Sequence, residues 1–211
     1  LVVQSAIDRD LIYFVSKWEN PVRSNTEALA RQARYQFLAD VVHATQADCL
    51  LTAHHQDDAV ETLLMRLIRG SSLKTMTGMS PYYRRVMQST NGQAQLTWMF
   101  RPLINVRKKE IYDYAHSHQI DYYEDTSNSS DLYLRNRLRN QILPLLEEEN
   151  PQLYSNWMKM QEYLVASYQL HFQSYLDLEA SLVARLHPGH WVLDVKNWRE
   201  LSQEARKIYL T

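Results

Sequence analysis

Two histidines and two aspartates lie within five positions of the stretch LTAHHQDDAVETLLMRLIRG, which runs from Leu51 to Gly70. An apolar run precedes them and an amphipathic run follows. Such a group can form a metal site or an acid/base cluster, or it can simply begin a helix. A zinc site is the weakest of these, because H-H-x-D-D lacks the two histidines four residues apart that zinc-binding helices use. The four residues are His54, His55, Asp57 and Asp58.

Helical spacing would let neighbouring side chains of this stretch act together. His54 and Asp58 are four residues apart, and Asp58 and Glu61 are three apart, so each pair can share one face of a helix. Paired carboxylates can hold Mg²⁺ or the ammonium group of an amine substrate. A neutral histidine beside them can move a proton or position a phosphate.

The same residues also suit the beginning of a helix. Asp57 or Asp58 can cap it, and Asp58-x-x-Glu61 resembles a capping box in which Asp replaces Ser or Thr. Acidic residues are also favourable at the positive end of the helix dipole. Capping explains one aspartate and the glutamate, but not the two histidines and the second aspartate. We therefore favour a functional site whose chemistry the pattern leaves open.

Positive charge is concentrated in one part of the chain, although the net charge is only −1. No Asp or Glu occurs between residues 66 and 109, whereas nine basic residues do. A stretch of one sign indicates a surface that meets an anion such as a nucleotide or nucleic acid, although a solvated basic face would give the same pattern. The basic residues are Arg66, Arg69, Lys74, Arg84, Arg85, Arg101, Arg107, Lys108 and Lys109.

Alternating strand and helix patterns predict an α/β fold with a parallel sheet. Ligands of such sheets bind beyond the carboxyl ends of the strands, where His54 to Asp58 lie. A hairpin is predicted around Asn91-Gly92, and a kink or break at Pro144. The predicted strands are 11–15, 49–53, 82–87, 95–100 and 191–195, and the predicted helices are 25–47, capped by Thr26, 57–68, 107–118, 135–148, a long helical region to about 186, and 197–210.

Cys49 is the only cysteine of the 211 residues. One cysteine cannot form a disulfide within the chain or supply a cysteine-ligated zinc or iron–sulfur site. Its apolar neighbours predict a buried side chain, and a reducing cytoplasmic location is consistent with it. No apolar segment of 18 residues and no signal-peptide pattern occurs, so we expect neither membrane insertion nor export.

Four blocks of the chain resemble the bacterial tRNA(Ile)-lysidine synthetases, which are N-type ATP pyrophosphatases. The blocks are ALARQARYQFL (28–38), LTAHHQDDAVETLLMRLIRGSS (51–72), FRPLINVRKKEI (100–111) and YEDTSNSSDLYLRNRLRNQILPLL (123–146). The resemblance implies an adenine nucleotide α-hydrolase-like domain over residues 1–149 and a smaller helical, tRNA- or substrate-binding domain over 150–211. It also implies ATP and Mg²⁺ as cofactors, L-lysine and a tRNA(Ile) with a CAU anticodon as partners, and it allows a homodimer.

In that family, ATP adenylates the C2 oxygen of the wobble cytidine, and free lysine then attacks C2 and expels AMP. Matching the motifs position by position gives each candidate a role. The implied catalytic residues are His54, Asp58, Glu61 and Arg34, with Asp58 also a candidate Mg²⁺ ligand. Implied for nucleotide binding are His55, Asp57, Arg69, Gly70 and Ser71, and for tRNA binding Arg135, Arg137, Arg139 and Arg101, while Asp125 and Asn128 would organise the turn that presents the arginines.

One element of the family is absent from the sequence. The SGGxDS phosphate loop needs two adjacent glycines, and none of the four glycines has a glycine neighbour. A strand–helix unit expected before Leu11 is also incomplete. We therefore expect the 211 residues alone to hydrolyse ATP poorly. Two other readings are a related tRNA-thiolating enzyme, which the single cysteine disfavours, and a non-catalytic tRNA-binding module, which the acidic cluster disfavours.

Overall fold

The computed structural model describes residues 1–17, 26–124, 133–187, 190–203 and 206. The chain divides into two compact units, one of residues 1–69 and 78–154 and the other of residues 70–77 and 155–211. The first unit contains the sheet and all the helices around the histidine and aspartate stretch. The predicted domain boundary at residue 150 stays a prediction.

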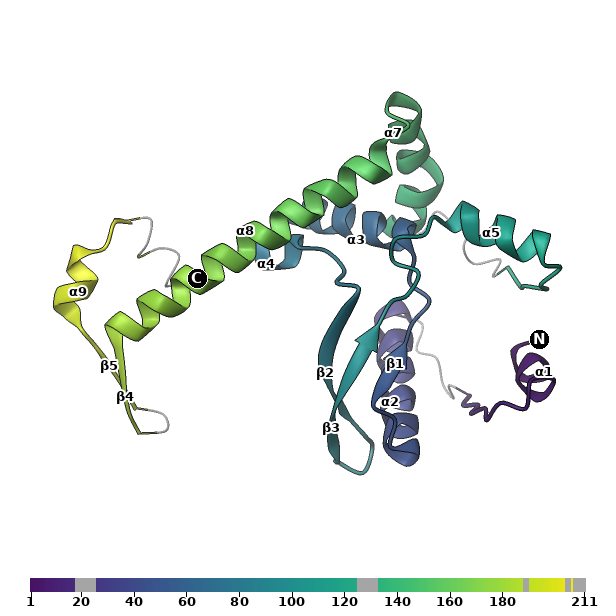
Figure 1. Cartoon of the computed structure of the whole chain (residues 1–211), viewed down its shortest axis with the longest axis horizontal. Coiled ribbons are helices and arrows are strands. Elements are labelled where there is room, and N and C mark those ends of the chain that lie inside the picture. Colours follow the sequence, from purple (N-terminus) through teal and green to yellow (C-terminus); the bar gives the residue numbers. More distant parts are fainter. Residues whose placement is uncertain (18–25, 125–132, 188–189, 204–205, 207–211) are drawn as a thin grey trace. The chain divides into compact units, whose positions relative to one another are not determined.

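Three strands form the sheet of the first unit, in the order β1 (Cys49–Leu51), β3 (Ala94–Phe100), β2 (Tyr82–Gln88). β2 and β3 are the predicted antiparallel hairpin, and its turn contains Gly92 with a φ of +83°, a conformation that favours glycine. β1 pairs with β3 in parallel, with Leu51 beside Phe100. The predicted α/β class is confirmed, but the sheet is mixed, because the hairpin adds an antiparallel strand (Figure 1).

Helix α2 (Thr26–Thr45) packs on one face of this sheet (Figure 1). Its Ala39 is buried against Met87 and Met99, which point inward from β2 and β3. The alternate side chains of the strands point to the opposite face, which the described residues leave largely uncovered. Cys49 belongs to that face and is exposed. The prediction of a buried cysteine was therefore wrong, because strand alternation directs Cys49 away from α2.

The helices that follow β1 and β3 begin near one another. Helix α3 (Gln56–Arg69) follows β1, and helix α5 (Lys108–Ser117) follows β3. The backbone N–H of Gln56 donates to the carbonyl of Val106 at 2.9 Å, which joins the two loops. At the start of α5, the backbone N–H of Arg107 donates to the Glu110 carboxylate at 2.7 Å. The expected arrangement, with helices beginning at the carboxyl ends of parallel strands, is confirmed at these two strands.

The segment predicted as one helix over residues 135–148 consists of three pieces. These are α6 (Leu134–Arg137), a π-helical turn η2 (Leu138–Ile142) and α7 (Leu143–Glu149). Pro144 lies in the first turn of α7. Proline has no N–H to donate to the preceding turn, so the regular α-helical pattern cannot continue through it. The predicted break at Pro144 is thus confirmed, and the polar segment 125–131, with Asp125 and Asn128, lies outside the described residues.

The predicted strand over residues 11–15 is wrong. A short helix α1 (Val2–Ile7) precedes it, and residues 11–17 have no regular secondary structure. Leu11, Ile12 and Val15 are exposed. A strand needs a neighbour to pair its backbone groups, and within the described ranges no strand pairs with this segment. Helix α2 begins at Thr26 as predicted, and the side chain of its predicted cap is not described.

The second unit contains helices α4 (Leu73–Met76) and α9 (Val195–Glu200), and most of α8 (Leu153–Leu182). Two strands, β4 (Val183–His187) and β5 (His190–Leu193), form an antiparallel hairpin. The predicted helix to residue 186 therefore ends earlier, because Val183 to His187 pair with β5. In the described part of the chain, no helix combines the length and apolar character needed to cross a membrane.

Candidate active site

The start of α3 is capped by His55 and Asp58. The backbone N–H of His55 donates to Asp58 Oδ2 at 3.1 Å, and the backbone N–H of Asp58 lies 3.4 Å from His55 Nδ1. This reciprocal arrangement corresponds to a capping box with His55 at the N-cap. The suggested box of Asp58 and Glu61 is therefore wrong by one turn, and Glu61 is directed elsewhere.

Glu61 is completely buried and binds two arginines from a distant part of the chain. Its Oε2 accepts hydrogen bonds from Arg135 Nε at 2.8 Å and from Arg139 Nη2 at 2.9 Å. Asp58 Oδ1 lies 3.3 Å from Arg135 Nη2 and 3.4 Å from Arg139 Nη2. We call these four residues the arginine–carboxylate cluster. It holds two positive and two negative groups, and both arginines reach Glu61 although they are four residues apart in the sequence.

Arg139 of this cluster is held in its charged form. Burial alone would lower the pKa of Arg139, but the hydrogen bond to Glu61 and the charges of Glu61 and Asp58 outweigh it and raise the pKa. A buried carboxylate is tolerated when such charge-assisted bonds satisfy it. Glu61 therefore fixes the direction of both guanidinium groups, while Asp58 remains partly accessible.

His54 is partly buried beside this cluster, and its ring is fixed by Thr52. The two side chains approach to 2.9 Å between Nδ1 and Oγ1. Burial lowers the pKa of His54, and the charges of Arg101, Arg31 and Arg135 lower it further, although Asp58 opposes them. The imidazole is therefore neutral at pH 7 and able to accept a proton at a free ring nitrogen.

We predict that His54 titrates below pH 6.5, the value of an unperturbed histidine. Because the folded pKa is the lower one, protonation favours the unfolded chain. The contribution of His54 to stability is then present above pH 6.5 and is lost as the pH falls below it. Nitrogen-15 NMR of the histidine rings would measure the midpoint, with the urea-denatured chain as the reference. A midpoint above that of the denatured chain would contradict the assignment.

A cleft of about 360 Å³ opens beside His54. It unites side chains from α2, from the end of β1, from α3 and from α6. Three of the four predicted catalytic residues line it, namely Arg34, His54 and Asp58, whereas Glu61 lies buried behind Arg135. Arg31 and Thr52 were not among the predicted site residues, although Arg31 is one helical turn before Arg34 and Thr52 directly precedes Ala53-His54. Among the lining residues are Arg31, Arg34, Thr52, His54, Asp58 and Arg135.

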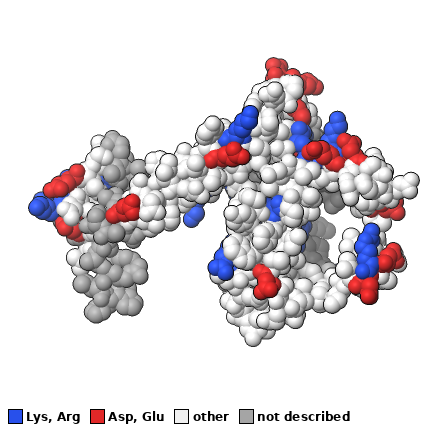
Figure 2. Space-filling model, in the orientation of Figure 1, with Lys and Arg blue, Asp and Glu red and all other residues white. Residues whose placement is uncertain are grey.

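Asp57 faces a different set of partners from Asp58. Its Oδ2 accepts the backbone N–H of Lys108 at 2.7 Å and lies 3.5 Å from Arg107 Nε. Arg107 also donates to Glu147 at 3.0 Å and lies over the ring of Tyr154. Burial raises the pKa of Tyr154 to about 12, and the Asp57 carboxylate contributes. Near α5 and α7, basic and acidic side chains indeed lie next to one another (Figure 2). Asp57 thus joins α3 to α5 and to the start of α8, and it does not line the cleft.

The remaining candidates are dispersed. Arg101 donates to the carbonyl of Ser80 at 2.6 Å and lies over Tyr83. Arg137 is exposed on α6. Arg69 is the last residue of α3. At a rise of 1.5 Å per residue, it lies about 20 Å along the helix axis from Gln56. Gly70 ends the helix with a φ of +72°, and Ser71 follows it in the second unit. The structure therefore does not bring Arg69 to the cleft.

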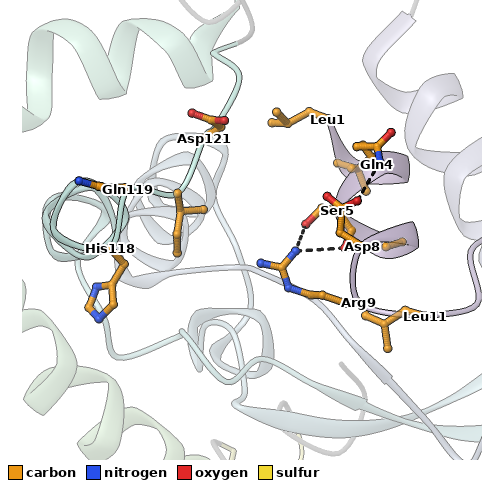
Figure 3. Close-up of a pocket in the computed structure, with 12 residues that line it drawn as sticks. Leu1, Gln4, Ser5, Asp8, Arg9, Leu11, His118, Gln119 and Asp121 are labelled. Atoms are coloured by element: carbon orange, nitrogen blue, oxygen red, sulfur yellow. Dashed lines mark hydrogen bonds between the residues drawn. The ribbon is translucent and has the colours of Figure 1, made fainter.

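A second hollow, of about 600 Å³, lies between α1 and the end of α5 (Figure 3). Arg9 in its wall donates to the Ser5 carbonyl at 3.0 Å, and Gln4 donates to Asp8 at 2.8 Å. None of the predicted site residues lines it. Its polar groups largely satisfy one another within α1, so it offers no comparable chemistry.

Comparison with known proteins gives two kinds of relationship. A family model described as a PP-loop domain matches residues 2–146. The tRNA(Ile)-lysidine synthase of Enterococcus faecalis is 43% identical over 145 residues, which are 68% of this chain and 29% of that protein. The enzyme of the same name from Bacillus subtilis is 38% identical over 145 residues, 69% of this chain and 29% of its own length. The match therefore spans less than a third of each relative.

A solved structure shares the fold. It is the U34-tRNA thiolase NcsA from Methanococcus maripaludis with its [4Fe-4S] cluster, and it superposes with a TM-score of 0.59. The match covers 78% of this chain and 55% of that one, with 17% sequence identity. At this identity the likeness concerns the fold alone.

Proposed function

The chain belongs to the PP-loop domain family, and we propose that it is the ATP-using part of a tRNA(Ile)-lysidine synthase. The adenine nucleotide α-hydrolase-like fold expected from the sequence agrees with this family. Relatives that carry the lysidine synthase name support the specific reaction. The observation that carries the proposal is the cleft in which Arg34, His54, Asp58 and Arg135 meet.

The arginines of the cleft suit the first step, in which the C2 oxygen of cytidine attacks the α-phosphate of ATP. Negative charge grows on the phosphate and on the departing pyrophosphate. Arg31, Arg34 and Arg135 place positive charge around the cleft, and fixed charges of this kind stabilise a transition state without reorganising. Arg135 is held in place by Glu61, so we assign Glu61 as a positioning residue.

The carboxylate and the histidine suit the second step. The amine of L-lysine forms a bond to C2, the bond from C2 to the adenylated oxygen breaks, and AMP leaves with that oxygen. The attacking amine loses a proton, which a neutral His54 is placed to accept. Asp58 lines the same cleft and is the acidic group available there to bind a lysine ammonium.

Mg²⁺, when bound, would neutralise charge on the triphosphate of ATP. Within the described ranges, no group of three or more histidine, cysteine or acidic side chains is arranged to hold a metal ion. Glu61 is buried and occupied by both arginines, which leaves Asp58 as the single carboxylate that lines the cleft among the described residues. The described residues therefore do not form a metal site by themselves, and we derive no step through the ion. Asp58 as a ligand, a homodimer and a cytoplasmic location stay predictions.

Transfer of labelled lysine to tRNA tests this function. We expect the whole protein that contains this chain to attach ¹⁴C-lysine to a tRNA(Ile) transcript with a CAU anticodon, only when ATP is present. A transcript with guanosine at the wobble position is the control, because it lacks the cytidine C2 carbonyl. Binding of tRNA without transfer would favour a non-catalytic module, and transfer of sulfur would favour a thiolating enzyme.

A further inference from the structure

We propose that a groove between α2 and β2 binds the phosphate backbone of the substrate RNA, with Arg31 and Arg85 as its ligands. This inference rests on the proposed function, because it names where the RNA strand lies beside the cleft. The groove has a volume of about 430 Å³, and its charged lining residues are these two arginines. Among the residues that the structure describes, no carboxylate lines it to compete for them.

Two guanidinium groups meet on one aromatic ring in this groove. The central carbon of Arg31 lies 5.0 Å from the centre of the Tyr35 ring, and that of Arg85 lies 4.2 Å from it. Tyr35 fixes both cations by cation–π contacts. In the described part of the chain, neither arginine forms an ion pair with a carboxylate, so their N–H groups remain available to an anion.

An anion would stabilise this arrangement. Two like charges near one ring repel each other, and a phosphate between them would turn the repulsion into two attractions. The planar fork of arginine matches two phosphate oxygens at once. A hydrogen bond holds the two sides of the groove together, because Gln36 on α2 donates to the carbonyl of Gln88 on β2 at 3.0 Å. Among the described residues, β2 is an edge strand of the sheet, so the groove is open there to an extended ligand.

The position of the groove favours RNA over a free nucleotide. Arg31 and Tyr35 line both this groove and the cleft that contains His54 and Asp58. An RNA strand whose wobble base enters the cleft would therefore carry its neighbouring phosphates along the groove. Arg85 also belongs to the basic stretch between residues 66 and 109, in which no acidic residue occurs. Binding of this type depends on salt, because the phosphates release counterions.

Arg85→Gln tests the groove, and Arg84→Gln is its matched control. Arg84 lies next to Arg85 in β2 but on the opposite face, over the ring of Trp98 at 4.9 Å. Each change removes one positive charge and one cation–π contact. The probe is a fluorescent stem-loop RNA with a CAU anticodon, titrated by anisotropy with the whole protein that contains this chain. We expect Arg85→Gln to weaken binding about fivefold and to lower the salt slope by about one, whereas Arg84→Gln changes binding less than about twofold.

Further measurements distinguish an RNA groove from a folding effect and from a nucleotide site. Arg85→Lys keeps the charge and should retain most of the binding, and equal melting temperatures of the two glutamine variants would exclude a folding effect. Equal weakening by Arg84→Gln and Arg85→Gln would contradict the proposed RNA groove, as would absence of RNA binding by the unaltered protein. If Arg85→Gln weakened ATP binding as much as RNA binding, the groove would be a nucleotide site and the proposal would be wrong. Failure of lysine transfer with the expected RNA result would instead reject the proposed function alone.

Discussion

Replacing Glu61 with leucine is expected to lower the free energy of unfolding by about 3–5 kcal/mol, the range typical for removing one partner of a buried ion pair. Glu61 is 0% exposed and accepts hydrogen bonds from both Arg135 and Arg139. The substitution would leave two partly buried guanidinium groups with only Asp58 near them. Urea denaturation followed by circular dichroism measures the loss, provided that the slope with denaturant stays unchanged.

Glu147→Leu is the control for this prediction. Glu147 also pairs with an arginine, Arg107, but its side chain is 40% exposed. Solvent screens such a pair, so its removal is expected to cost about 1 kcal/mol or less. Similar losses for the two variants would mean that burial does not distinguish the two ion pairs, and the positioning role of Glu61 would then lose its physical basis.

Local patterns predicted the elements around the site well. The helical pattern predicted over residues 25–47, the Asn91-Gly92 turn and Pro144 each act through nearby backbone, so α2, the β2–β3 hairpin and the break before α7 follow from the sequence. The cap of α3 was misplaced by one turn, because several acidic residues compete there. The residue that caps α3 depends on where the helix begins. Its first residue, Gln56, is held by the tertiary hydrogen bond from its backbone N–H to the carbonyl of Val106.

Contacts between distant segments were not predictable in the same way. Arg135 and Arg139 are 74 and 78 residues from Glu61 in the sequence. The family resemblance identified all three as candidate site residues. Only the fold shows that both arginines pair with Glu61, which is buried, whereas Asp58 stays partly accessible. The adjacent aspartates differ for the same reason, because Asp57 is directed toward the start of α5. Residues 11–15 have strand-forming side chains, yet a strand also needs a partner, which composition does not supply.

Replacing Asp58 with asparagine is expected to reduce lysine transfer about 100-fold or more, a loss typical of removing one group that stabilises charge in a transition state. Asparagine keeps the size of the side chain and can still accept the backbone N–H of His55, so the cap of α3 should persist. The lost negative charge would weaken binding of the lysine ammonium. Transfer of ¹⁴C-lysine at increasing lysine concentration measures the effect, and ATP-dependent release of pyrophosphate measures the first step separately.

Asp57→Asn is the matched comparison, because it removes the same charge one residue away. Asp57 binds Lys108 and Arg107 and does not line the cleft, so this variant should lose stability while lysine transfer falls less than about tenfold. If Asp58 acts on lysine, its variant should lose transfer more than pyrophosphate release, and circular dichroism should be unchanged. Normal transfer by Asp58→Asn would reject the assignment, because no other carboxylate lines the cleft among the described residues. An equal loss in both variants would instead mean that the two aspartates act together in holding the start of α3.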